Sequence, residues 1–161
     1  MKGVVYLGDS EVEVREFPQP ESGPGQIVIE SKVAGLCGSD LHKYYCSRAW
    51  AQERNGMISG HEPTGIVAAV GPHVEWPSIG DRVCVYHRLG CGHCAPCRSG
   101  YAAFCDVGSG AFGRTQDGSH ADYMLADARY CLPLPEEVSF AVGTQLACTA
   151  GTSFAALCKI P

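Results

Sequence analysis

Short apolar runs separated by glycine and proline fill the first 135 residues. Several alternate apolar and polar positions with a period of two, as a β-strand with one buried face does. Glu11–Arg15 shows this best, so Val12 and Val14 should face inward and the charged residues outward. Many short strands between turns indicate a barrel or a sandwich. The predicted strands are Val4–Leu7, Val12–Phe17, Ile27–Val33, Ile66–Val70, Arg82–Tyr86 and Ala121–Leu125.

The spacing of apolar residues changes after Pro135. Glu136 and Glu137 precede apolar positions at helical spacing, and acidic residues favour the first turn of a helix. This predicts one or two helices near the C-terminus, interrupted near Gly151.

Composition narrows the class of protein. At 161 residues, with 45% apolar and 18% charged positions, the chain can bury the core of one domain. A net charge of −5 disfavours nucleic acid and anionic membranes as partners. No apolar run approaches the roughly 20 residues that span a bilayer, and the first residues lack the apolar core of a signal peptide. We expect a soluble, cytoplasmic protein.

Four of the ten cysteines are concentrated in one short stretch. Their spacing, Cys-x2-Cys-x2-Cys-x7-Cys, supplies four soft ligands for a tetrahedral zinc, with no open position. A redox-active Cys-x-x-Cys pair is the alternative, but the thioredoxin-like βαβ context is missing. The pattern predicts a structural zinc site made of Cys91, Cys94, Cys97 and Cys105.

Three other segments carry metal-binding or proton-transfer side chains. Gly35–His42 contains a thiol, a hydroxyl, a carboxylate and an imidazole; Gly60–Gly65 contains an imidazole and a carboxylate; Cys148 lies in the predicted helical tail. Each segment alone is weak evidence, because a single buried cysteine or histidine usually belongs to the core.

Together these motifs resemble the zinc-containing medium-chain alcohol dehydrogenases. The matching order is Cys-x-Ser-Asp-x-His, Gly-His-Glu-x2-Gly-x5-Gly, Gly-Asp-Arg-Val, the four cysteines and a late cysteine, over essentially the whole chain. The resemblance implies a mostly β, GroES-like, partly open barrel with a protruding zinc lobe and C-terminal helices. Residues 1–150 would be the zinc-binding catalytic domain, and 151–161 the start of a linker helix toward an absent Rossmann domain.

The resemblance also implies roles for individual residues. Cys37, His61 and Cys148 would bind a catalytic zinc and leave its fourth position for water or substrate. Glu62 would lie behind the metal or become a transient ligand. Asp40 would accept the second N–H of His61 and orient its ring.

The implied reaction is hydride transfer from a zinc-bound alcohol to NAD or NADP. Zinc would lower the pKa of the bound hydroxyl toward roughly 7, and Ser39 and His42 would carry its proton to solvent. The cofactor would bind only with the missing domain. Small alcohols or aldehydes would be substrates, and a homo-oligomer is compatible with this. The identity of the alcohol and the choice of cofactor stay open.

A stand-alone zinc-binding module without turnover, serving a partner protein, is the alternative. Ser39 together with His42 favours the enzyme, because an idle module needs no proton relay. Tyr44–Ile58 corresponds to a variable substrate loop, where Tyr44 and Trp50 could line a pocket or simply pack.

Two features are assigned no catalytic role. Gly108–Gly113 spells GxGxxG, but it follows a metal loop rather than a strand and precedes a turn, so we reject it as a dinucleotide site. The remaining cysteines are expected to be buried thiols; they are Cys46, Cys84, Cys131 and Cys158.

Overall fold

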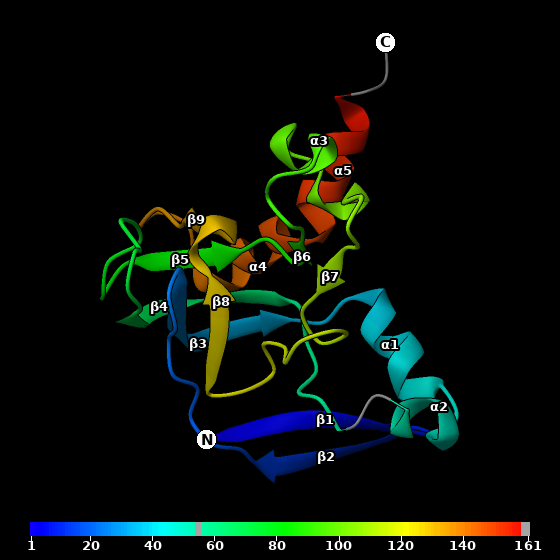
Figure 1. Ribbon diagram of the computed structural model, residues 1–161. Coiled ribbons are helices and arrows are strands. Elements are labelled where there is room, and N and C mark those ends of the chain that lie inside the picture. Colours follow the sequence, from blue (N-terminus) through cyan, green and yellow to red (C-terminus); the bar gives the residue numbers. More distant parts are fainter. Residues whose placement is uncertain (54–55, 159–161) are drawn as a thin grey trace.

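Five antiparallel strands form the central sheet, in the order β8-β3-β4-β5-β9 (Figure 1). The computed structural model describes residues 1–53 and 56–158. Four of these five strands were predicted from the sequence, whereas the three-residue β9 is too short to show alternation. The strands are β3 (Gln26–Gly35), β4 (Glu62–Val70), β5 (Arg82–Val85), β8 (Tyr123–Asp127) and β9 (Cys131–Pro133).

The core lies against this sheet. Alternating residues of β3 and β5 supply much of it, and Phe112 fills it from the loop after the cysteine lobe. The described strands form three separate sheets rather than a closed ring, so the expected mostly β, open architecture is confirmed. The main core residues are Ile27, Ile29, Val67, Val83, Val85, Phe112 and Met124.

The N-terminal hairpin pairs β1 (Lys2–Gly8) with β2 (Glu11–Glu16) and lies along the lower side of the molecule in Figure 1. The expectation that both β2 valines face inward is wrong, since Val12 is 52% and Val14 63% exposed. Strand β1 contacts the body of the protein, where Val5 is buried, and β2 forms the outer edge. Alternation identified the strand but not whether its apolar face is covered.

Helix α2 (Arg48–Gln52) and the last two residues of helix α1 (Gly38–Tyr45) lie in the segment expected as a variable substrate loop, Tyr44–Ile58. Residues 54–55 lie outside the described part. Tyr44 packs edge-on against Tyr6, with ring centroids 6.4 Å apart, and Trp50 packs against His42 at 5.9 Å. These contacts favour the packing interpretation for both aromatic residues.

A lobe of short elements protrudes from the sheet beside the C-terminal helices (Figure 1). In the GxGxxG stretch, only Gly110–Ala111 is a strand, and the N–H of Gly113 donates a hydrogen bond to the carbonyl oxygen of Gln116 at 2.8 Å, as in a turn. No helix follows it within the described part up to residue 127, as its rejection requires. The lobe comprises β6 (Arg88–Leu89), α3 (Ala95–Arg98), η1 (Ala102–Phe104) and β7 (Gly110–Ala111).

The chain continues into helices α4 (Phe140–Ala147) and α5 (Thr149–Leu157). They are bent by 52° at Cys148, three residues before the predicted interruption at Gly151. The Ser139 hydroxyl caps α4 by accepting the N–H of Val142 at 3.2 Å. Helix α5 runs through residue 150, and the division of the chain at that residue stays a prediction.

The four other cysteines follow the prediction only in part. Cys84 and Cys131 are buried, Cys46 is half-buried, and Cys158 is exposed. The expectation was wrong for Cys158 because it follows α5, whose outer residues are mostly exposed. In the described part of the chain no single helix is long and apolar enough to cross a membrane; α4 and α5 meet that test only as a bent pair.

Candidate metal sites

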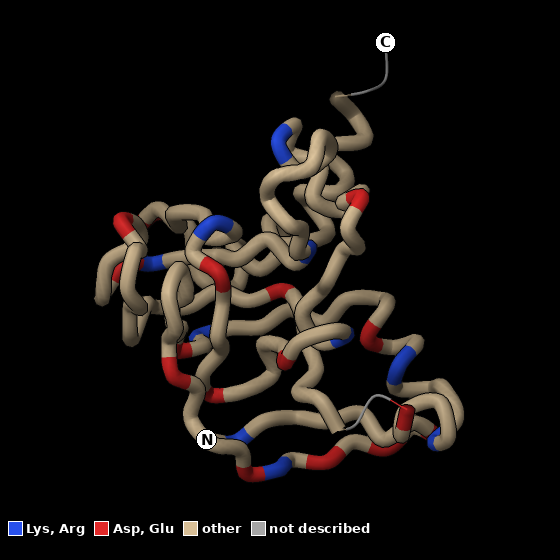
Figure 2. The backbone as a smooth tube through the Cα atoms, viewed as in Figure 1, with Lys and Arg blue, Asp and Glu red and all other residues tan. Residues whose placement is uncertain are grey.

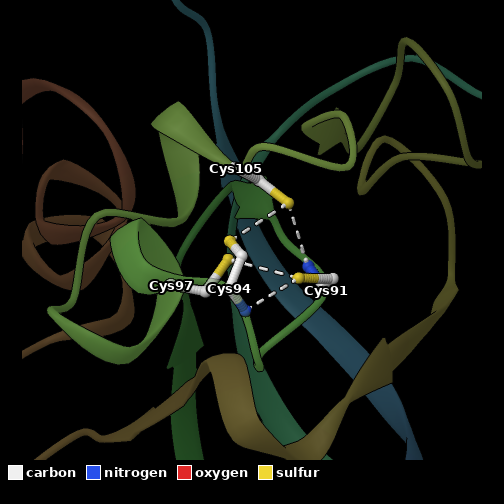
Figure 3. A group of neighbouring side chains, drawn as sticks. All are labelled: Cys91, Cys94, Cys97 and Cys105. Atoms are coloured by element: carbon white, nitrogen blue, oxygen red, sulfur yellow. Dashed lines mark hydrogen bonds between the residues drawn. The ribbon is translucent and has the colours of Figure 1, made fainter.

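The four lobe cysteines converge with their sulfurs within 4.8 Å of one another (Figure 3). The sulfurs of Cys91 and Cys97 are 4.0 Å apart, and those of Cys94 and Cys105 are 3.9 Å apart. Sulfurs around a tetrahedral zinc, with bonds of about 2.3 Å, lie about 3.8 Å apart, whereas a disulfide requires about 2.05 Å. The spacing therefore fits four thiolates around one ion.

Backbone N–H groups turn this loop into a cradle for thiolates. Cys94 donates its N–H to the Cys91 sulfur, and Cys91 donates its own to the Cys105 sulfur, each at 3.3 Å (Figure 3). The hydrogen bond from Cys91 is the main cause that lowers the pKa of Cys105 to about 6. Tyr130 holds the base of the lobe, because its hydroxyl contacts both the N–H and the carbonyl of Gly90 at 2.8 Å.

A second group gathers residues from distant parts of the chain. Cys37 lies just before α1, His61 and Glu62 lie at the start of β4, and Cys148 lies at the break between α4 and α5. One ligand atom from each of the four lies within 4.8 Å of the others. The structure thus brings together the three residues predicted to bind a catalytic zinc, with Glu62 beside them.

Asp40 connects two members of this second group. Its fully buried carboxylate accepts the N–H of Cys37 at 3.1 Å, and its other oxygen lies 3.5 Å from Nδ1 of His61 and 3.5 Å from Nζ of Lys43. Burial raises the pKa of Asp40. His61, and after it the N–H of Cys37 and the charge of Lys43, lower this pKa by more, so it lies below its ordinary value. Asp40 is therefore ionised and holds Nδ1 of His61, leaving Nε2 for an ion.

Burial and close neighbours also shift the pKa values of His61, Cys37 and Cys148 in the second ligand group. Burial lowers the pKa of His61, but the hydrogen bond and charge of Asp40 outweigh it and raise the net value. Burial raises the pKa of Cys37, but hydrogen bonds from Ser39 and from His61 lower it overall. Burial, then the nearby Cys37 and Glu62, raise the pKa of Cys148 to about 12. A cation among these groups would favour both thiolates.

Glu62 is buried and fixed by its surroundings. Its Oε1 accepts a hydrogen bond from the Thr149 hydroxyl at 3.3 Å. Gly35 faces the other oxygen so closely that an added Cβ would lie 2.3 Å from Oε2. A glycine at this position therefore leaves the space that the carboxylate occupies.

The structure places the two residues of the predicted proton relay, Ser39 and His42, on helix α1. Ser39 hydrogen-bonds to the Cys37 thiol, next to the ligand group. His42 is exposed, three residues later on α1, and its ring packs against Trp50. Residues three apart are neighbours on a helix surface, so both side chains belong to the same side of α1.

His87, which follows β5, also lies beside the second group and was not predicted from the sequence. Its ring centroid lies 5.5 Å from that of His61, and its Nδ1 lies 2.7 Å from the carbonyl oxygen of Ala147. Burial lowers the pKa of His87. No periodic pattern indicates this residue, because its partners are 26 and 60 positions away in the sequence.

The sequence is similar to known proteins. The chain matches the family model of the alcohol dehydrogenase GroES-like domain over residues 23–136. It is 40% identical, over 157 residues, to the uncharacterized zinc-type alcohol dehydrogenase-like protein YphC of Escherichia coli (strain K12), covering 92% of this chain and 44% of that protein. It is 32% identical, over 148 residues, to an alcohol dehydrogenase of Geobacillus stearothermophilus, covering 91% and 43%.

A solved structure shows the same fold. The cobalt- and zinc-bound thermostable alcohol dehydrogenase from Pyrobaculum aerophilum matches with a TM-score of 0.84 and 30% identity, covering 99% of this chain and 49% of that one. The chain spans less than half the length of these relatives. Fold, motifs and family model agree, and this chain belongs to the zinc-type medium-chain alcohol dehydrogenases, whose GroES-like domain it carries.

Proposed function

We propose that this chain holds the catalytic zinc and the substrate in an enzyme that moves hydride between a small alcohol or aldehyde and NAD or NADP. The observation that supports this most is the second ligand group. Three of its members, Cys37, His61 and Cys148, are the thiolate and imidazole donors that zinc prefers. Three protein ligands leave a position for substrate, whereas four lobe thiolates leave none, so we assign the lobe a structural zinc.

The residues around the second group have separable tasks. Zinc bound there would polarise a substrate oxygen and lower the pKa of a bound hydroxyl. Asp40, ionised and buried, orients His61. Ser39, beside Cys37, would take the hydroxyl proton outward, and His42, exposed on α1, would release it to solvent.

The C-terminal helices suggest where a cofactor-binding part would pack. Helices α4 and α5 carry no charged residue, as their tan tube in Figure 2 shows, yet Val142, Leu146, Phe154 and Leu157 are all exposed. Apolar patches of this kind commonly mark interaction surfaces. We propose that NAD or NADP binding depends on residues outside these 161.

The cellular setting and assembly are also proposals. All ten cysteines lie in the described part, and none is in a disulfide. Free thiols and thiolate metal sites suit a reducing compartment, so we place the protein in the cytoplasm. A homo-oligomer is compatible with the exposed apolar residues.

Elemental analysis tests the two zinc sites. We expect two zinc ions per chain in the unmodified protein, and one in each of the variants Cys37→Ser and Cys94→Ser. Circular dichroism serves as the control for folding. An unchanged zinc content in Cys37→Ser would contradict the catalytic site.

A separate measurement tests the reaction. The 161 residues alone should show no micromolar affinity for NAD or NADP by calorimetry. Joined to a nucleotide-binding domain of a relative, the chain should oxidise at least one small alcohol, and Cys37→Ser should abolish this. Turnover that survives Cys37→Ser would refute the catalytic assignment.

A further inference from the structure

We propose that His87 is a positioning residue that fixes Cys148 against His61 by capping the end of α4. The inference rests on the proposed function in one respect, namely that Cys148 binds the ion of the second group. It concerns how the fold holds a ligand that lies outside regular structure.

The need for a cap follows from the position of Cys148. The backbone leaves helical geometry there, with φ −139° and ψ −71°, between two helices bent by 52°. The last carbonyl groups of a helix have no partner within it. The carbonyl of Ala147, next to Cys148, meets this need through Nδ1 of His87 at 2.7 Å. A carbonyl only accepts, so Nδ1 carries the proton.

The ring of His87 is held from two sides. It contacts the ring of His61, with centroids 5.5 Å apart, and the ring of Tyr86, with centroids 5.2 Å apart. His87 lies two residues after β5, a mostly buried strand of the central sheet. One imidazole therefore touches the segments that carry two members of the second group, and it ties both to the sheet.

The residue after Cys148 is held as well. The Thr149 hydroxyl donates to Glu62, the fourth member of the group, at 3.3 Å. Contacts to the sheet thus flank Cys148 on both sides, at Ala147 and at Thr149. The Ala147 contact is the shorter one, 2.7 Å against 3.3 Å, and it uses a half-buried ring, so its loss should displace Cys148 more.

Two substitutions separate the donor from the ring. His87→Phe keeps an aromatic ring but removes the donor, whereas His87→Asn places an amide N–H close to the position of Nδ1. The probe is zinc release to an excess of a chromogenic chelator. The phase of zinc release that disappears in Cys148→Ser belongs to the second site. The phase that remains belongs to the lobe ion and serves as the internal reference for the rates.

We expect His87→Phe to release the second ion about tenfold faster, because groups that orient metal ligands typically contribute 10- to 100-fold to affinity. His87→Asn should stay within about threefold of the unmodified chain, and the lobe ion should leave at the same rate in all three. His87→Leu is a second donor-free variant if phenylalanine prevents folding.

Equal release of the second ion in all variants would overturn the inference. So would a lobe ion that leaves faster in parallel, since that indicates a general loss of stability, or a His87→Asn variant as fast as His87→Phe. If Cys148→Ser removes no phase at all, the proposed catalytic site itself fails. If it removes one while His87→Phe changes nothing, only the inference about His87 fails.

Discussion

Asp40 illustrates how one side chain can organise a ligand group. It accepts the N–H of Cys37, faces Nδ1 of His61, and is balanced by Lys43. As the third residue of α1 it also forms a capping box with Cys37, so the start of the helix and the metal group share one carboxylate. Its charge, rather than its shape, distinguishes it from asparagine.

Asp40→Asn should therefore weaken zinc binding at the second group by about 10- to 100-fold, because it removes the charge that orients His61. Competition with a chelator of known affinity measures this. Asp122→Asn, at an exposed residue that accepts the N–H of Lys2, is the matched control and should bind zinc normally. Equal affinity in both variants would show that Asp40 has no such role.

A substitution at Gly35 tests the space that this residue leaves for Glu62. In Gly35→Ala the new Cβ would lie 2.3 Å from Oε2 of Glu62, so the buried carboxylate must move. We expect a loss of about 1–3 kcal/mol in the free energy of unfolding, the usual cost of overpacking. Urea denaturation measures it. Gly38→Ala is the control, since its Cβ meets nothing within 4 Å and alanine favours helix α1.

The sequence predicted the residues of the two ligand groups, but not the residues that hold those ligands in place. Cysteine spacing indicates the lobe directly, because its members are close in sequence. The resemblance named Cys37, His61 and Cys148, and the structure brings them together. His87 and Thr149 escaped notice because a hydrogen bond between distant segments leaves no local pattern in the sequence.

At the scale of elements, strands were easier to predict than short helices. Alternation locates β1 to β5 and β8 within a few residues, since each is long enough to show a period. Helices α1, α2 and α3 have eight residues or fewer, about two turns, and give little periodic signal. The break at Cys148 was placed too late because Gly151 is the stronger local helix breaker, whereas tertiary contacts set the actual position.

The contribution of the N-cap of α4 to stability can be tested at Ser139. Ser139→Ala removes the hydroxyl that accepts the N–H of Val142, and it should cost about 1 kcal/mol of stability, as N-cap losses typically do. Thermal and urea unfolding measure the change. Ser153→Ala, at an exposed position inside α5, is the control and should leave stability nearly unchanged or slightly raised. Similar losses in both variants would argue against the cap.

Within the whole molecule, the two ligand groups differ in the length of chain between their first and last ligands. The lobe thiolates span residues 91–105, whereas the second group spans residues 37–148. Closing a longer loop costs more entropy, and helices α4 and α5, on either side of Cys148, leave apolar side chains exposed. The second site should thus be the weaker one in these 161 residues.

A chelator titration should accordingly remove the zinc of the second group before the lobe zinc. Zinc release followed by a colorimetric indicator, with Cys148→Ser to identify the first phase, measures the order. Cys94→Ser should also lower the unfolding temperature more than Cys148→Ser, since a structural zinc contributes directly to folding. Simultaneous loss of both ions, or earlier loss of the lobe ion, would contradict this ordering.

The two strands of the N-terminal hairpin differ in how they are held to the rest of the protein. Strand β1 is joined to the body through Val4, whose N–H donates to His120 and whose carbonyl accepts from Ser59, but β2 pairs only with β1 among the described residues. Amides at such an edge open without global unfolding. In hydrogen–deuterium exchange, Val12 and Val14 should therefore exchange many times faster than Ile27 and Ile29 of β3, and their rates should not respond to zinc removal.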